Sequence, residues 1–269
     1  MLIGEILARN ARMYGNEVAL IEREPAKDRR IEITWKEFDE QANRFANALI
    51  AKGIRKGDKV IHLMMNCIEW LPAYFGILRT GAWAVPLNFR FSAQDIKLCA
   101  GIAEGKVMIF GEEFIERVTE SKEKLFTITD YIFMGPDDVR PDYAERYEDV
   151  LEKSSPVNPD VEIGIEDDAS LYFTSGTTGT PKPILLTHRN LEAACIIETR
   201  HQNQTDKDNF LLIPPLYHTG AKMHWFGSFI VASKAVILKG IRPEWILEAV
   251  SEEKATIVWL LVPWAQDIL

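Results

Sequence analysis

The stretch of sequence with the clearest chemical potential runs from Phe173 to Asn190 and reads FTSGTTGTPKPILLTHRN. Gly176 and Gly179 let backbone N–H groups approach an anion closely, because glycine places no side chain in the way. Lys182 adds a cation, and four neighbouring hydroxyl groups add donors: Thr174, Ser175, Thr177 and Thr178. Donors to a charged phosphate contribute roughly 1.5 to 3 kcal/mol each, so several can orient a triphosphate. The stretch therefore predicts a phosphate-binding loop, and its composition alone leaves a flexible surface hairpin as the alternative.

The order of residues in this loop differs from the G-x-x-x-x-G-K-[ST] phosphate loop. Pro181 stands before the lysine, where that motif has glycine, and Pro183 follows the lysine. A Walker-type NTPase is therefore disfavoured.

The nine residues TSGTTGTPK closely resemble the signature of the adenylate-forming superfamily, which includes acyl-CoA synthetases, firefly-type luciferases and peptide-synthetase adenylation domains. Four more stretches resemble that family in the same order: TWKEFDEQANRFANALIAKGIRKGDKV, GILRTGAWAVPLNFRFS, PPLYHTGA and ATIVWLLVPWAQDIL. The resemblance implies a ligase that uses ATP, Mg²⁺ and CoA. Such an enzyme converts a carboxylic acid into an acyl-adenylate and pyrophosphate, and then into an acyl-CoA.

The same resemblance implies roles for individual residues. Thr174 to Gly179 and Lys182 would hold the β- and γ-phosphates and the leaving pyrophosphate, and Lys182 and His218 would be catalytic. His218 would lie near the acid's carboxylate and the thiol channel, with Tyr217 and Trp225 also contacting the acid; an apolar or aromatic acid is favoured over acetate. Two plainer interpretations stay open, in which His218 caps the next helix and Trp225 is a core aromatic. Pro183 departs from the family, which has glycine there, so loop closure is expected to differ.

The remaining polar residues are expected to be structural. His188 is placed where a strand turns into a helix, and His62 is expected to be a core histidine. His218 and His224 lack the carboxylate between them that a zinc-protease helix carries, so no metal site is expected. Lys222 is expected to be solvated, and three cysteines are expected to pack among apolar neighbours: Cys67, Cys99 and Cys195.

Alternating strands and helices would position this chemistry. A capping-box pattern at Thr34 and a capping residue at Ser92 predict helix starts, and a further helix is expected from Asn66 to Leu78. The βαβ alternation predicts an α/β protein with two doubly wound, largely parallel sheets, as in the large N-terminal domain of adenylate-forming enzymes, incomplete here. The first subdomain is expected over residues 1–168, ending in a long connection from 136, and the second over 169–269, carrying the phosphate loop.

Composition bounds the remaining possibilities. The net charge of −9 over 269 residues disfavours a general nucleic-acid or anionic-membrane binder. The odd cysteine count, with no secretory leader, predicts reduced thiols and a cytoplasmic protein. No apolar run is long enough to span a membrane.

The family's later elements do not occur in this chain. By resemblance these are a glutamate for Mg²⁺, an aspartate for the ribose, and a small C-terminal domain with the catalytic lysine. The chain is therefore expected to be inactive alone and to need the missing C-terminal part or a complementary chain. Self-association into homo-oligomers is the other expected way of covering the apolar faces that the missing part would leave exposed. Two alternatives stay open: a non-catalytic nucleotide- or acid-binding module, and an adenylation unit with another acceptor.

Overall fold

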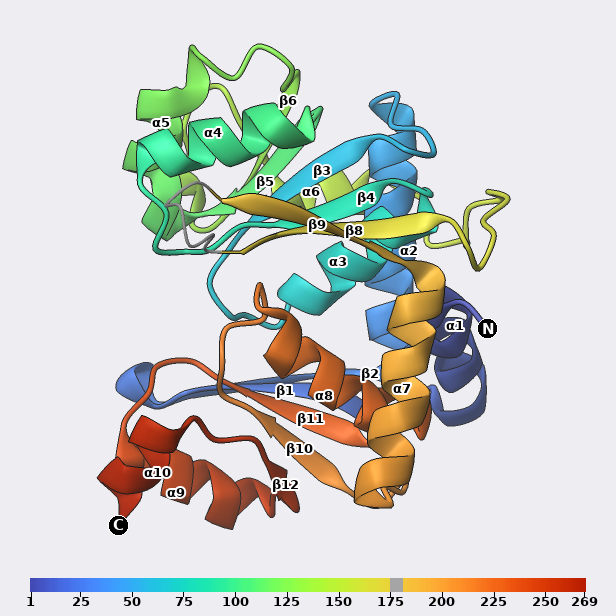
Figure 1. Ribbon diagram of the computed structural model, residues 1–269, viewed down its shortest axis with the longest axis vertical. Coiled ribbons are helices and arrows are strands. Elements are labelled where there is room, and N and C mark those ends of the chain that lie inside the picture. Colours follow the sequence, from blue (N-terminus) through green and yellow to red (C-terminus); the bar gives the residue numbers. More distant parts are fainter. Residues whose placement is uncertain (175–180) are drawn as a thin grey trace. The chain divides into compact units, whose positions relative to one another are not determined.

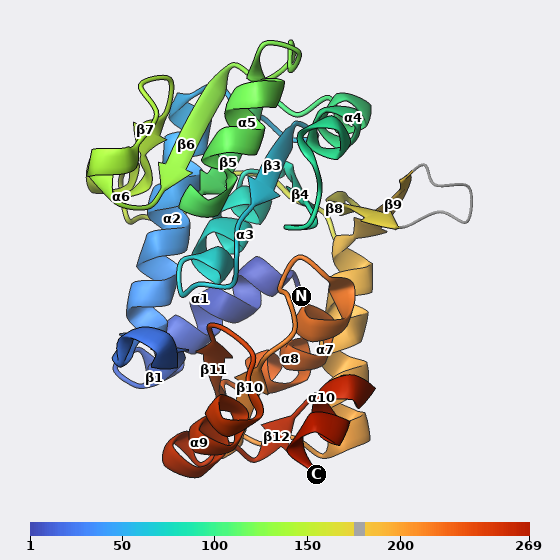
Figure 2. The same cartoon turned by 90° about the vertical axis from the view of Figure 1, so that its left-hand side faces the viewer.

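The computed structural model describes residues 1–174 and 181–269, and the chain divides into two compact units (Figures 1 and 2). The first unit comprises residues 1–39, 66–70 and 190–269, and the second comprises residues 40–65 and 71–189. The sequence predicts a single boundary at residue 168, whereas each unit is built from more than one stretch of chain.

The first unit is built on a five-stranded sheet in the order β12-β10-β11-β1-β2. Its strands are β1 (Val18–Glu24), β2 (Arg29–Thr34), β10 (Asn209–Leu212), β11 (Lys234–Leu238) and β12 (Ile257–Val258). All neighbours are parallel except the β1–β2 hairpin. The helices are α1 (Ile3–Tyr14), α8 (Thr219–Ile230), α9 (Pro243–Glu253) and α10 (Val262–Ile268). Figure 1 shows α9 and α10 on one side of this sheet and α8 on the other.

Alternate strand residues form the core beneath α9. Leu211 and Ile213 lie two apart along the chain, as do Val236 and Leu238, so each pair faces the same side of the sheet. They pack against Ile246 and Ala249 of α9. Pro243 occupies the first turn of that helix, where its missing N–H is not needed, as the sequence predicted.

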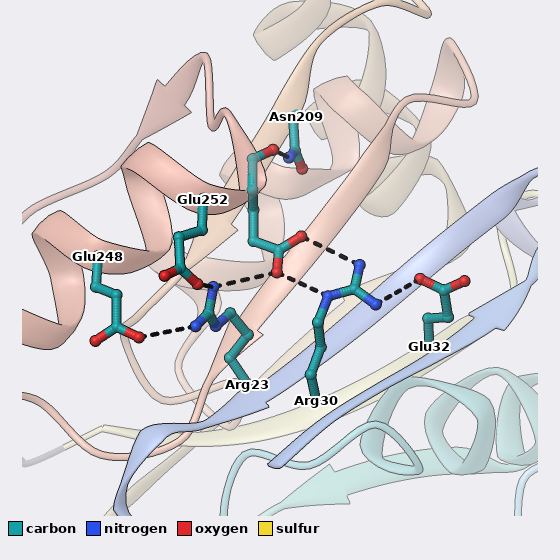
Figure 3. Close-up of polar contacts among 7 residues, drawn as sticks. Arg23, Arg30, Glu32, Asn209, Glu248 and Glu252 are labelled. Carbon is teal, nitrogen blue, oxygen red and sulfur yellow. Dashed lines mark hydrogen bonds and ion pairs between the residues drawn. The ribbon is translucent and has the colours of Figure 1, made fainter. Parts of the chain in front are cut away.

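A charge network joins the β1–β2 hairpin to α9 (Figure 3). Arg23 on β1 contacts Glu248 at 2.9 Å and also pairs with Glu252 and Glu253. Arg30 on β2 donates from Nε to Glu253 Oε1 at 2.8 Å, and this contact raises the pKa of the guanidinium. Hence Glu253 accepts from two arginines on adjacent strands, which explains how charged residues can lie on a strand of this sheet.

The second unit is built on a seven-stranded sheet in the order β7-β6-β5-β3-β4-β8-β9. Its strands are β3 (Lys59–Leu63), β4 (Trp83–Pro86), β5 (Val107–Gly111), β6 (Asp130–Met134), β7 (Glu145–Arg146), β8 (Asp168–Thr174) and β9 (Lys182–Thr187). Every pairing is parallel except β8 with β9. Its helices are α4 (Ala93–Ala103), α5 (Ile115–Lys122), which follows a 3₁₀ turn, and α6 (Tyr147–Glu152). The α/β class with two largely parallel sheets is thus confirmed.

Three helices contribute residues to both units: α2 (Trp35–Ala51), α3 (Trp70–Arg79) and α7 (His188–Gln202). The start of α2 is confirmed, because Thr34 N donates to Glu37 Oε2 at 2.7 Å and Glu37 N donates to Thr34 Oγ1 at 3.2 Å. Ser92 and Asp95 form the same reciprocal cap on α4.

The expected helix start at Asn66 is wrong. Helix α3 begins at Trp70, which places Pro72 in its first turn, where proline is tolerated. The Asn66 side chain instead bonds the backbone near residues 214–216. The expected connection from 136 to 168 also contains β7 and α6, and β7 pairs with β6 at the sheet edge.

Within the part of the chain that the structure describes, no helix is both long and apolar enough to cross a bilayer.

Candidate functional site

The antiparallel strands β8 and β9 flank the predicted phosphate loop. Thr174 and Lys182 face each other in the last register pair, and Thr174 Oγ1 donates to the Lys182 carbonyl oxygen at 3.5 Å. Both residues are exposed, so the ammonium group is available at the mouth of the loop, and the hydroxyl can donate to a ligand by exchanging its long bond to the Lys182 carbonyl oxygen. The other residues predicted to bind phosphate, Ser175, Gly176, Thr177, Thr178 and Gly179, lie outside the described residues.

The loop leaves the carboxyl end of β8, which runs parallel to β4. The parallel strands β3, β4, β5 and β6 end on the same edge of the sheet. Ligands in open α/β sheets bind outside this carboxyl edge, because the connecting loops gather there. The position of Thr174 and Lys182 is therefore suited to binding a ligand.

A cluster of buried hydroxyl groups fixes β8 just before the loop. Tyr74 Oη on α3 lies 2.7 Å from Ser170 Oγ and 3.4 Å from Tyr172 Oη. Burial raises the pKa of Tyr172 well above its ordinary value, so the phenol stays protonated and can donate. Sequence reasoning missed this cluster, although Ser170 and Tyr172 are two apart on a strand and so share one face.

Pro183 lies on β9, opposite Phe173. Strand β9 stands at the end of the sheet, so among residues 1–174 and 181–269 it has a strand neighbour on one side only. Proline cannot donate to a ladder and is confined to such edges, which explains how this departure from the family is accommodated. Figure 2 shows β8 and β9 at this edge.

The other predicted site residues lie in the first unit, on the segment that leads into α8. His218 is the N-cap of that helix, and its Nδ1 accepts from Gly220 N at 3.1 Å. The imidazole is exposed, and the Tyr217 ring is edge-on to it with centroids 6.3 Å apart. The capping interpretation thus agrees with the structure, and an exposed ring keeps its Nε2 side available for a ligand.

Trp225 is fully buried in the first unit. Its ring centroid lies 5.7 Å from that of Phe226 and 5.1 Å from that of Phe229, which in turn contacts Trp35. The structure therefore brings Tyr217 and His218 together and places Trp225 within the aromatic core of the same unit. Thr174 and Lys182 belong to the second unit.

The prediction that Lys222 is solvated is wrong. Its side chain is fully buried on α8, with Nζ 5.0 Å from the centroid of the Trp70 ring. Burial lowers the pKa of this amine well below its ordinary value. Helical spacing alone did not indicate that Lys222 is buried, because Trp70, against which it packs, lies in a segment that is distant in sequence.

Three of the other four histidines make contacts within the core or with neighbouring helices. His62 is buried on β3 with Nε2 3.2 Å from Met64 Sδ, and His188 is buried at the start of α7. His224 Nδ1 lies 2.9 Å from Glu198 Oε2, and its ring centroid is 5.0 Å from that of Trp259. The described residues contain no group of three or more His, Cys, Asp or Glu side chains that could hold a metal ion.

The three cysteines are free thiols. Burial raises the pKa of Cys99 and of Cys195 to about 12 in each case, which keeps both thiols protonated. Burial also raises the pKa of Cys67 well above its ordinary value, with Glu69 adding to the effect. The three thiols are therefore poor nucleophiles.

The sequence matches the family model described as "AMP-binding enzyme" over residues 7–269. The chain belongs to this family. It is 30% identical over 263 residues to the long-chain-fatty-acid–CoA ligase FadD13 of Mycobacterium tuberculosis (strain H37Rv), covering 97% of this chain and 47% of that protein. It is 28% identical over 229 residues to a feruloyl-CoA synthase of Amycolatopsis sp., covering 84% of this chain and 43% of that protein.

The fold of this AMP-binding family member is also that of solved relatives. The inhibitor-bound N-terminal domain of FACL13 from Mycobacterium tuberculosis superposes with a TM-score of 0.89 at 26% identity, covering 99% of this chain and 64% of that one. The chain thus spans about half the length of the curated relatives that it matches.

Proposed function

We propose that this chain is the N-terminal part of an ATP-dependent, AMP-forming carboxylic acid:CoA ligase. The observation that carries the proposal is the exposed Thr174–Lys182 pair at the mouth of a donor-rich loop, on the carboxyl edge of a parallel sheet in an AMP-binding family member. The family match supports ATP and CoA as co-substrates, and we propose that ATP enters as its Mg²⁺ complex.

In the proposed first step, a carboxylate oxygen of the acid attacks the α-phosphorus of ATP, and pyrophosphate leaves. Both reactants are anionic, so the reaction depends on positioning and on charge neutralisation. The Lys182 ammonium group, with the Thr174 hydroxyl and the loop donors, would offset the negative charge of the β- and γ-phosphates. Lys182 therefore stabilises the leaving pyrophosphate in this scheme.

In the proposed second step, the CoA sulfur attacks the acyl carbon of the adenylate, forming a thioester and releasing AMP. We assign the acid's carboxylate to the neighbourhood of Tyr217 and His218, whose rings meet edge-on at the start of α8. Trp225 is proposed to contribute to acid binding through the aromatic core that it forms with Phe226 and Phe229.

The names of two relatives support an apolar or aromatic acid. These relatives are a long-chain-fatty-acid–CoA ligase and a feruloyl-CoA synthase. We infer that the acid of the present protein is of this kind rather than acetate.

We also propose that further chain completes the enzyme. The chain covers 47% of FadD13, and the edge strand β9 exposes 44% of Ile184 and 40% of Leu185. Exposed apolar residues on an edge strand favour pairing with additional structure, whether a C-terminal part, a complementary chain or a second copy. We also propose a reducing, cytoplasmic compartment, which the three free thiols would suit.

The experiment that tests this function is acid-dependent pyrophosphate release from ATP, with long-chain, cyclic and aromatic acids. The 269-residue chain is assayed alone and then with the C-terminal half of FadD13 added. We expect ATP binding without turnover in the first case. A nucleotide-binding module without catalytic activity would bind ATP but would release no pyrophosphate, even with the C-terminal half added. A chain that does not bind ATP would contradict the proposal itself.

A further inference from the structure

The segment before His218 is held by contacts that the proposed reaction does not use. Leu216 is fully buried, and its N–H donates to Asn66 Oδ1 at 2.8 Å. The Asn66 amide also donates from Nδ2 to the Pro214 carbonyl oxygen at 3.0 Å. Asn66 therefore fixes two backbone groups of this segment at once.

The carbonyl of Leu216 faces Lys222. The Nζ atom of Lys222 donates to this oxygen at 3.5 Å and lies 5.0 Å from the centroid of the Trp70 ring. Trp70 and Asn66 belong to the same short segment, residues 66–70 of the first unit. Hence the N–H of Leu216 is bonded to Asn66, and its carbonyl is bonded to a lysine that lies against Trp70.

These contacts restrain the backbone on both sides of the Leu216 Cα. The N–H bonded to Asn66 belongs to the peptide group before this atom, and the carbonyl bonded to Lys222 belongs to the peptide group after it. Peptide groups are planar, so holding both of them leaves little freedom for the φ and ψ angles of Leu216. The direction in which the chain continues into Tyr217 and His218 is thereby set.

A lysine at this buried position on α8 costs more free energy to bury than an apolar residue would. Burying an amine costs free energy unless it is hydrogen-bonded, and burial lowers the pKa of Lys222 accordingly. Leucine or methionine would fill a buried helix position without that cost. Leu216, however, lies between β10 and α8, where its carbonyl has no regular ladder to join, and a buried carbonyl requires a donor.

We propose that Lys222, together with Asn66, is a positioning residue that fixes Tyr217 and His218 through the two peptide groups of Leu216. Lys222 lies four residues after His218, so it joins the first turn of α8 to the segment that leads into the helix. The importance of this placement for acid binding rests on the proposed function. The hydrogen bonds to Leu216 do not depend on that function, because they are observed in the chain.

The test is an NMR measurement on the complete 269-residue chain labelled with ¹³C-histidine. The chain contains five histidines and therefore gives five imidazole signals. His218→Asn assigns the His218 signal. We expect Lys222→Met, which keeps the volume but removes the donor, to shift and broaden the His218 signal. The signals of His62 and His188, which lie in the other unit, are expected to stay in place.

Lys207→Met is the matched control, because Lys207 is exposed in the same unit. It is expected to leave all imidazole signals unchanged. If Lys222→Met does not fold, Asn66→Ala tests the proposal instead. This variant removes the hydrogen bond to the Leu216 N–H and is expected to shift the same His218 signal. A His218 signal that keeps its wild-type position and width in the folded variant overturns the proposal.

An ATP titration of the same samples separates this proposal from the proposed function. A shifted His218 signal in a chain that does not bind ATP supports the positioning role and contradicts the ligase. An unshifted signal in a chain that binds ATP does the reverse.

Discussion

Thr174 and Lys182 form the last register pair of the β8–β9 hairpin, with the Thr174 hydroxyl donating to the Lys182 carbonyl oxygen at 3.5 Å. The backbone of Lys182 is thus tied to the opposite strand while its ammonium group is exposed. A cation whose backbone is held and whose side chain is exposed is suited to following phosphates through a reaction.

Pro183→Gly tests the departure from the family at the edge of the loop. The fold is expected to persist, because Pro183 lies on an edge strand. The apparent ATP affinity is expected to change by roughly two- to fivefold, since backbone substitutions of this type amount to about 0.4 to 1 kcal/mol. Isothermal titration measures it, with Pro159→Gly in the coil after α6 as the control. Identical titrations of the Pro183→Gly and wild-type chains would exclude a role for this proline.

Glu253→Gln tests the charge network of Figure 3. The Glu253 carboxylate is buried and bridges Arg23 and Arg30, so its loss leaves two guanidinium groups short of an acceptor. Because Arg30 is half exposed, we expect a loss of about 1 to 3 kcal/mol in the free energy of unfolding, between the values for surface and buried pairs. Urea unfolding followed by tryptophan fluorescence measures it.

Glu252→Gln is the matched control for that variant. Glu252 is on the same helix and pairs with Arg23, but 56% of its side chain is exposed. Its replacement is expected to cost less than about 1 kcal/mol. Equal losses for the two variants would show that Glu253 has no special position in the network.

Glu22→Gln tests the pH dependence that a buried carboxyl group produces. Glu22 is 1% exposed on β1 and accepts from Ile68 N at 2.8 Å, and Lys239 lies 3.9 Å away. Burial raises its pKa above the ordinary 4.5, with Lys239 opposing the effect in part. The folded chain therefore binds this proton more tightly than the unfolded chain does. The resulting stability is fully present below pH 4.5 and is lost as the pH rises through the folded-state pKa.

Urea midpoints measured upward from pH 4.5 check this sign. The wild-type chain is expected to lose stability relative to Glu22→Gln as the pH rises, because glutamine can still accept the Ile68 N–H but does not ionise. Glu17→Gln, at an exposed position, is expected to run parallel to the wild type. A constant difference between wild type and Glu22→Gln across this range would contradict the account.

Local signals in the sequence predicted local structure well. The caps at Thr34 and Ser92 depend on residues three positions apart, and both are confirmed. The alternation of strand and helix patterns predicted the two largely parallel sheets, and the strands on either side of the loop follow from the apolar runs before and after it. The phosphate-binding roles of Thr174 and Lys182 stay predictions.

Features that depend on distant partners could not be predicted in this way. Strand β1 carries Glu22, Arg23 and Glu24, which obscure its strand pattern, and Arg23 is accommodated by glutamates on α9, more than 200 positions later. The burial of Lys222 could not be predicted for the same reason, since the Trp70 ring beside its Nζ comes from a segment far earlier in the chain.

The central claim is that the loop between Thr174 and Lys182 binds the phosphates of ATP, and the ATP affinity of Lys182→Ala tests it most directly. Calorimetric titration with Mg·ATP compares this variant with wild type and with Lys207→Ala, which removes an exposed lysine elsewhere. The account predicts that Lys182→Ala weakens binding roughly 10- to 150-fold, as expected for the loss of a charged donor, and that Lys207→Ala does not. Equal affinities for all three chains would contradict it.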